Sequence, residues 1–422
     1  MYNTNRIWTA VASGLAVCAL AGMGCGGGGS STGTKAAANL PPAVAAALRG
    51  VTPPPAAIVS ANNNLGFQLL AQMRTTDTGK NVFISPASIA LCMEVLYNGA
   101  AGSTQTAMAQ ALDLGTLTTS ALNNDNADLE ASLISSDPAV QLTVANSFWY
   151  HKAANQILPS FVNTNMQYYG SYIGDLGGAP NNINAWVSSQ TNGQITNIVG
   201  QEVQNYVAMM VNAVYFKGAW TSPFNTAQTS SSTFTLADGV TTVPCSQMQQ
   251  TNQFPYFKGD HFQAIELPYG KQRTTMLVFL PNAGVTVDSV IAEITSASLS
   301  TWLPQFTPLE GTISLPKFTS GYTSNLKPVL TALGMGVAFN PNTANFSNMG
   351  AGLYLDTAVH KTYLSVDEAG TVAAAVTSVG VGVTDAPVPE FNMAVNRPFV
   401  CAILDQQTGE ILFYGAIDTP AL

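Results

Sequence analysis

Residues 368–389 read EAGTVAAAVTSVGVGVTDAPVP, and this stretch decides how the whole chain is interpreted. From residue 371 to residue 384 it contains no charge, no proline and no large side chain. Successive side chains of a β-strand point to opposite faces of the sheet. One face of such a strand would carry Thr371, Ala373, Ala375 and Thr377, and the other Val372, Ala374, Val376 and Ser378. Neither set would place a charge in a protein interior, so the segment suits both an exposed loop and a central strand.

Two plainer interpretations of this segment are a buried strand with a glycine-containing bend and a flexible low-complexity loop. A third interpretation is a loop that can insert into a sheet, because the segment suits both states. Further motifs lie along the rest of the chain. They occupy residues 81–89 (NVFISPASI), 96–104, 183–187, 191–195, 212, 216–220, 267–269, 315–318, 333–335, 396–399 (NRPF) and 412–417 (LFYGAI). In this order, across residues 57–422, they resemble the motifs of the serpin family. Residues 368–375 resemble the serpin hinge, except that Val372 stands where the family has glutamate.

The resemblance implies an α+β protein with the serpin fold, in which three β-sheets are surrounded by about eight or nine helices and a reactive-centre loop is exposed. It also implies a serine-protease inhibitor that acts as a suicide substrate. The protease attacks the loop with its own serine and forms an acyl-enzyme. The cleaved loop then inserts into the main β-sheet and traps the protease in a covalent complex. The alternative left open is a non-inhibitory serpin that acts as a binding or structural protein.

The resemblance assigns the reactive bond to Thr384 and Asp385, and leaves the bond before Thr384 open as an alternative. Loop specificity is then carried by Val381, Gly382 and Val383. These residues are small and uncharged, so a trypsin-like protease, whose pocket prefers Arg or Lys, is a poor target. An elastase-like or subtilisin-like protease is expected. The hinge comprises Glu368, Gly370, Thr371, Val372, Ala373, Ala374, Ala375, Val376 and Thr377.

Two structural sites also follow from the resemblance. The first is a hydrogen-bond network beneath the opening strands of the main sheet, formed by Ser85, Ser88, Asn212 and His360. The second is the breach, where insertion begins, formed by Trp220, Lys317 and Glu368. His360 is therefore expected to be structural, and the chain is not expected to be an enzyme.

The N-terminal residues have the pattern of an export signal. Arg6 precedes an uncharged stretch over residues 7–24, and Cys25 is followed by four glycines. We expect residues 1–25 to be a signal peptide, and a membrane-spanning helix is the alternative. Cys25 resembles the lipidation site of bacterial lipoproteins, although the three residues before it depart from that pattern. The protein is expected to be exported from a bacterial cell, either secreted or attached to the cell envelope through a lipid on Cys25.

Residues 26–56 have the composition of a Gly/Ser/Pro-rich tether. No comparable linker follows, so residues 57–422 are expected to form one serpin domain. Apolar periodicity predicts helices over residues 58–74, 88–97, 183–191 and 326–333. Strands are predicted over residues 141–148, 207–216, 264–267, 275–280, 312–315, 362–366, 399–404 and 411–414.

Composition limits the classes of partner. The chain has 14 Lys and Arg against 23 Asp and Glu, a net charge of −9, and no basic run, which disfavours nucleic-acid binding. Cys92, Cys245 and Cys401 lie among apolar neighbours and are expected to be buried. Neither these cysteines nor the three histidines have metal-ligand spacing, so no metal or cofactor is expected. We expect a monomer whose partner is a serine protease.

Overall fold

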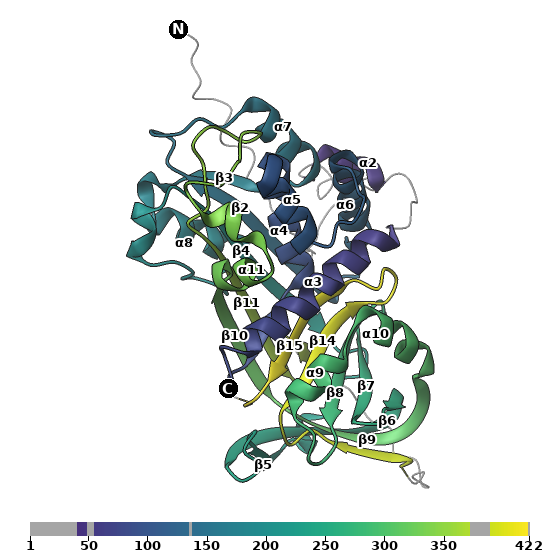
Figure 1. Cartoon of the computed structure of the whole chain (residues 1–422). Helices are drawn as coiled ribbons and strands as arrows, with labels where there is room; N and C mark the ends of the chain where they lie inside the picture. Colours follow the sequence, from purple (N-terminus) through teal and green to yellow (C-terminus); the bar gives the residue numbers. More distant parts are fainter. Residues whose placement is uncertain (1–39, 49–54, 135–136, 372–388, 421–422) are drawn as a thin grey trace, which may run out of the picture. The chain divides into compact units, whose positions relative to one another are not determined.

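The computed structural model describes residues 40–48, 55–134, 137–371 and 389–420 (Figure 1). These residues form ten α-helices, five 3₁₀ helices and fifteen β-strands. They divide into two compact units. The described residues within 40–58, 88–215 and 323–361 form the first unit, and those within 59–87, 216–322 and 362–420 form the second.

The helices follow the apolar patterns of their sequences. The α-helices are α2 (Pro42–Ala47), α3 (Ala56–Arg74), α4 (Pro86–Gly99), α5 (Gly102–Ala111), α6 (Thr119–Leu133), α7 (Pro159–Tyr168), α8 (Asn181–Gln190), α9 (Val287–Glu293), α10 (Ser296–Trp302) and α11 (Lys327–Ala332). The 3₁₀ helices are η1 (Leu176–Gly178), η2 (Gln201–Asn205), η3 (Thr226–Gln228), η4 (Leu303–Gln305) and η5 (Met335–Phe339). Helix α4 is buried along almost its whole length, which its apolar composition predicted. The ends of other helices are fixed by capping: the Thr118 side chain accepts a hydrogen bond from the backbone of Ala121 at the start of α6.

The strands form two hydrogen-bonded sheets. The strands are β1 (Val82–Ile84), β2 (Val140–Tyr150), β3 (Tyr172–Asp175), β4 (Ala208–Ala219), β5 (Ser230–Thr235), β6 (Thr242–Lys258), β7 (Phe262–Tyr269), β8 (Thr274–Pro281), β9 (Thr307–Pro316), β10 (Phe318–Asn325), β11 (Thr357–Asp367), β12 (Gly370–Thr371), β13 (Phe391–Ala394), β14 (Phe399–Asp405) and β15 (Ile411–Ile417). The nine-stranded sheet has the order β1-β15-β14-β8-β7-β6-β9-β13, with β5 paired to β6. The six-stranded sheet has the order β10-β11-β12-β4-β2-β3, and β11 also pairs with β4.

The expected α+β class is confirmed, but the element counts differ from expectation. Ten α-helices occur among the described residues in place of eight or nine, and the strands form two hydrogen-bonded sheets in place of three. The cause is β6, a continuous strand of 17 residues. Its first residues pair with β5 and its last with β7, while β9 pairs along its middle. Two sheets that would otherwise be separate are thereby joined.

Strands β8, β14 and β15 lie in the core of the second unit. All residues of β8, β14 and β15 are buried, and Figure 1 shows β14 and β15 side by side in yellow. Strand β14 pairs antiparallel with both β8 and β15. Strands buried on both faces are continuous apolar runs, which is why the sequence identified them. The rings of Phe83 on β1 and Phe413 on β15 stack with their centroids 5.5 Å apart.

Part of the segment expected to be a tether is a packed helix. Within residues 26–56, α2 begins with a proline and continues with alanines, both of which suit the first turns of a helix. Val44 is fully buried against Ala127 and Ala131 of α6. Tertiary packing therefore orders a segment whose composition alone indicated a linker. Among the helices of the described residues, none has the length and hydropathy needed to cross a membrane.

Candidate functional site

The first residues of the expected hinge form a strand within the six-stranded sheet. In β12, Thr371 pairs with Val366 of β11 on one side and with Gly218 of β4 on the other. Gly370 has a φ of +147°, and a Cβ atom there would overlap the carbonyl oxygen of Gly218. Only glycine fits this conformation and this close backbone approach. Gly370 and Thr371 of the predicted hinge therefore lie in the sheet between β11 and β4.

Thr371 is held by an aromatic pair. Its side chain is 0% exposed, and its hydroxyl shares a hydrogen bond of 2.7 Å with the hydroxyl of Tyr269. The Tyr269 ring stacks on Trp220, with 4.4 Å between centroids and 12° between planes. A buried hydroxyl without a partner would destabilise the fold, so the hydrogen bond to Tyr269 offsets the cost of burying the Thr371 hydroxyl.

The turn between β11 and β12 is fixed by hydrogen bonds to Trp220 and Asp367. The Trp220 indole donates to the Asp367 carbonyl at 2.9 Å, and the Trp220 backbone N–H donates to the Ala369 carbonyl at 3.0 Å. The carboxylate of Asp367 accepts from the backbone N–H groups of Ala369 and Gly370. The predicted breach residue Trp220 therefore contacts the turn that leads into the hinge.

The other two breach residues form an ion pair beside this turn. Lys317 Nζ lies 2.8 Å from Glu368 Oε2, and the Thr229 hydroxyl donates to Glu368 Oε1 at 2.7 Å. Burial by itself would raise the pKa of Glu368, but the hydrogen bonds from Lys317 and Thr229 outweigh it and the pKa is lowered. The structure thus brings Trp220, Lys317 and Glu368 around one turn. Sequence reasoning missed Thr229, since it lies in a run of serines and threonines with no distinguishing signal.

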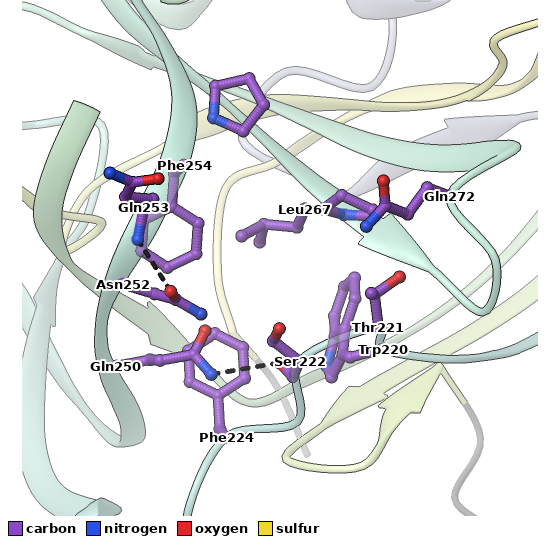
Figure 2. A pocket seen from close by; sticks show the side chains of 12 residues that line it. Trp220, Thr221, Ser222, Phe224, Gln250, Asn252, Gln253, Phe254, Leu267 and Gln272 are labelled. Atoms are coloured by element: carbon purple, nitrogen blue, oxygen red, sulfur yellow. Dashed lines mark hydrogen bonds between the residues drawn. The ribbon is translucent and has the colours of Figure 1, made fainter. Parts of the chain in front are cut away.

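A small cavity of about 160 Å³ lies beside the breach (Figure 2). Its walls carry the aromatic rings of Trp220 and Phe224 and the carboxamides of Gln250, Gln253 and Gln272. Gln250 donates to the backbone carbonyl of Ser222 at 3.1 Å, as Figure 2 shows. The lining side chains are uncharged, so this cavity offers hydrogen bonds and ring faces without a general acid or base.

Three members of the predicted sheet-opening network lie together in the first unit. Asn212, on β4, donates from its amide nitrogen to the backbone carbonyl of Ser88 at 3.1 Å and to the Ser88 hydroxyl. Its amide oxygen lies 2.5 Å from His360 Nδ1. Because that oxygen can only accept, the proton of the neutral imidazole is on Nδ1. Asn146 of β2 also accepts from Asn212, and sequence reasoning did not identify it.

Ser85, the fourth member, is buried in the second unit. Its hydroxyl donates to the backbone carbonyl of Leu412 at 2.6 Å, which ties the start of α4 to β15. Thr362 of β11 carries a further buried hydroxyl, which donates to the carbonyl of Phe83 at 2.6 Å.

The burial of His360 predicts a pH dependence of stability. Burial lowers the pKa of His360 from 6.5 to about 3. The unfolded chain therefore binds a proton that the folded protein does not, between about pH 6.5 and pH 3. The stability contributed by the neutral ring is complete above pH 6.5 and is lost progressively as the pH falls toward 3.

Between about pH 7 and pH 5, we expect the thermal midpoint of the wild type to fall by a few degrees more than that of His360→Gln. This difference corresponds to a loss of about 2 kcal/mol in the free energy of unfolding of the wild type. Glutamine stays neutral at both pH values, and its amide can still donate to Asn212. Carboxyl groups that titrate in this range affect both proteins alike and cancel in the comparison. A difference that does not change with pH would contradict the assignment of a buried neutral imidazole.

Several predicted residues lie outside the described part of the chain. These are the hinge residues Val372, Ala373, Ala374, Ala375, Val376 and Thr377, the specificity residues Val381, Gly382 and Val383, the reactive-bond residues Thr384 and Asp385, and Cys25. Their roles stay predictions. The cysteines Cys92, Cys245 and Cys401 are buried, as expected, and form no disulfide with one another.

Fold and site together define a mixed α+β protein in which the chain turns back after β11 and enters a sheet between β11 and β4. The family model described as serpin (serine protease inhibitor) matches residues 60–420. An uncharacterised serpin-like protein of Thermococcus kodakarensis is 33% identical over 379 residues, which cover 86% of this chain and 85% of the relative. The chain belongs to the serpin family.

Other relatives and solved structures agree with this assignment. The leukocyte elastase inhibitor of Xenopus laevis is 28% identical over 377 residues, covering 86% of this chain and 99% of the relative. The native crystal structure of the thermophilic serpin tengpin matches with a TM-score of 0.79 at 29% identity, covering 86% of this chain and 94% of its own. Human thyroxine-binding globulin with its hormone matches with a TM-score of 0.80 at 28% identity, covering 86% and 99%. These matches confirm the expected serpin fold.

Proposed function

We propose that this chain inhibits serine proteases as a suicide substrate, by loop cleavage, acyl-enzyme formation and insertion of the loop into the six-stranded sheet. The observation that carries the proposal is β12, in which Gly370 and Thr371 lie between β11 and β4. This is the start of the path that the rest of the hinge would follow. The relative from Xenopus laevis, whose name describes it as an elastase inhibitor, supports the same function.

The composition of the hinge supports insertion beyond Thr371. In a strand that continues from β12, every second residue points to the same face as Thr371, and those residues are Ala373, Ala375 and Thr377. Thr371 is already accommodated with its side chain 0% exposed, so the smaller alanines would need no more room at equivalent positions. Strand β11 also pairs directly with β4, and these two strands would have to separate as insertion proceeds.

The side chains before the reactive bond indicate the kind of protease. Val381, Gly382, Val383 and Thr384 are small and uncharged. A protease with a shallow or small apolar pocket would accept them, whereas a pocket that carries a carboxylate for Arg or Lys would not. We therefore propose an elastase-like or subtilisin-like target.

Incubation with pancreatic-type elastase or subtilisin is expected to give a covalent complex that survives boiling in SDS. Trypsin is expected to give none with the wild type. The matched variant Thr384→Arg is expected to form the complex with trypsin, because only the residue before the scissile bond has changed. N-terminal sequencing of the released peptide would locate the cleaved bond.

The contrary outcome is a cleaved chain with every protease still active and no covalent complex. It would favour the alternative, a non-inhibitory serpin that binds another molecule. The match to thyroxine-binding globulin, whose structure contains a bound hormone, is the observation that keeps that alternative open.

A further inference from the structure

Helices α4 and α6 of the first unit share a buried polar cluster that the proposed inhibitory function does not use. It contains Glu94 and Asn98 of α4 and Asn123, Asn126 and Glu130 of α6. Residues three, four or seven positions apart lie on the same face of a helix, so each helix presents its polar residues together. Glu94 is 1% exposed, Glu130 is 4% exposed and Asn126 is 0% exposed. Polar side chains therefore occupy positions that would normally be apolar.

Part of the cluster is satisfied by its own hydrogen bonds. Asn98 and Asn123 each donate from the amide nitrogen to the amide oxygen of the other at 2.9 Å. The hydroxyl of Tyr169, which follows α7, donates to the Asn123 oxygen at 2.7 Å. Asn126 donates to the same hydroxyl at 3.4 Å. These contacts align the three elements around the two glutamates.

Four further oxygens of the cluster have no hydrogen-bond partner among the described residues. Both carboxyl oxygens of Glu94, Oε2 of Glu130 and Oδ1 of Asn126 are buried and accept no hydrogen bond from the described residues. Buried polar atoms are nearly always hydrogen-bonded in folded proteins, and a buried carboxylate needs an opposite charge as well. The ion pairs among the described residues involve neither glutamate. The cluster thus has four oxygen acceptors and no cation.

The pKa values of Glu94 and Glu130 are consistent with buried carboxyl groups that lack a counter-ion. Burial raises the pKa of Glu94 to about 8, and the neighbouring Asn126 amide offsets only part of that increase. Burial and the charge of Glu94 raise the pKa of Glu130 well above its ordinary value. Both shifts disfavour a charged carboxyl group at this place, so a charged pair here needs a cation beside it.

We propose that Glu94, Glu130 and Asn126 bind one Ca²⁺ ion between α4 and α6. Ca²⁺ accepts carboxylate and amide oxygens, in one-oxygen or two-oxygen contacts and with flexible geometry. Two carboxylates balance its charge. Mg²⁺ usually keeps several waters and needs a stricter octahedron, so a buried cluster suits it less. The absence of sulfur and imidazole from the cluster disfavours zinc and copper.

A cavity of about 500 Å³ lies beside the polar cluster. Asn98 and Asn123 line it together with Phe161, Thr164 and Tyr168 of α7. The two asparagines therefore belong both to the cavity wall and to the buried cluster. Water in this cavity could complete the coordination, since Ca²⁺ takes about six to eight oxygen ligands.

The test uses the full chain, freed of metal with a chelator and then titrated with CaCl₂. We expect the thermal midpoint to rise by about 5 °C at a Ca²⁺ concentration about a hundred times Kd. Tb³⁺ in place of Ca²⁺ is expected to show luminescence when the protein's tyrosines are excited, because Tyr169 lies beside the site. Added Ca²⁺ should displace Tb³⁺ and quench the signal.

Substitutions of the proposed ligands test where the ion binds. Glu94→Gln and Glu130→Gln change shape little, and each is expected to abolish the Ca²⁺ response and the Tb³⁺ signal. Asn126→Ala is expected to weaken binding by about tenfold. Asp125→Asn and Asp128→Asn, which make the same kind of change on the more exposed side of α6, should respond like the wild type.

Two results would overturn the proposal. A wild-type protein that shows neither a Ca²⁺-dependent midpoint nor Tb³⁺ luminescence has no such site, and its glutamates are then neutralised by protons. An unchanged response in Glu94→Gln, Glu130→Gln or Asn126→Ala would place the ion elsewhere. The wild-type measurement decides the matter even when a glutamine variant fails to fold.

Discussion

Cleavage of the bond between Thr384 and Asp385 is expected to raise the thermal midpoint of the chain by roughly 20 °C. Once cut, the hinge can extend from β12 between β11 and β4. A strand of about a dozen residues adds a similar number of backbone hydrogen bonds, each worth about 1 kcal/mol. Folded proteins of this size gain about 2 °C for each kcal/mol of stabilisation. The increase in thermal midpoint measures the free energy that loop insertion releases in an inhibitor of this kind.

The measurement is differential scanning calorimetry of the intact and the cleaved chain. A useful control is Ala375→Pro, because proline cannot donate to the strand ladder and interrupts a central strand. Cleavage should raise the thermal midpoint of this variant much less than it raises that of the wild type, although both are cleaved at the same bond. Equal midpoints for intact and cleaved wild-type protein would mean that no driving force is stored, and the proposed trap would fail.

Replacement of Thr371 by arginine is expected to reduce the yield of covalent complex by about a hundredfold, since burial of an unpaired charge costs several kcal/mol. Thr371 is fully buried between two strands, and its hydroxyl bonds to Tyr269. An arginine there would keep the hinge out of the sheet. Insertion would then be slower than hydrolysis of the acyl-enzyme, and the variant would be cleaved as an ordinary substrate.

The matched control is Thr371→Val, which keeps the volume, adds no charge and removes the hydrogen bond to the buried Tyr269 hydroxyl, at a cost of about 1–3 kcal/mol. It should retain most of the inhibition. The ratio of covalent complex to cleaved chain, measured on denaturing gels at several protease concentrations, separates the two variants. If Thr371→Arg inhibits as well as the wild type, the hinge does not insert along the path that begins at β12.

The strands identified from the sequence are those whose side chains are buried on one or both faces. Strands β8, β14 and β15 were predicted because every residue in them is buried, which requires unbroken apolar runs. Strand β6 was missed, although it is 17 residues long. Many of its residues are polar and exposed, so the period-two pattern in its sequence is weak. The strand is stabilised instead by its pairing with β5, β7 and β9. Helix α2 was missed for a related reason, since its packing against α6 and against Tyr168 of α7 distinguishes it from a linker.

Some residues of the candidate site were predicted from the sequence, and others were found only in the structure. The residues of the predicted breach and of the predicted His360 network were assigned from the resemblance to the family, and the structure brings Trp220, Lys317 and Glu368 together at one turn. Their partners Thr229, Asn146 and Tyr269 had no predicted role. Tyr269 lies in the motif over residues 267–269, but its contact, like those of Thr229 and Asn146, depends on a side chain more than sixty residues away in the chain.

By itself, the sequence determined the family, the α+β class and the small, uncharged character of the hinge. Those properties depend on side-chain size, charge and period, which are local. Only the tertiary structure decided that Gly370 meets the backbone of Gly218, that Thr371 reaches Tyr269, and that Glu94 and Glu130 become neighbours without a counter-ion. Each of these depends on how distant strands and helices pack, because close approach, burial and the loss of water arise only when the elements are assembled.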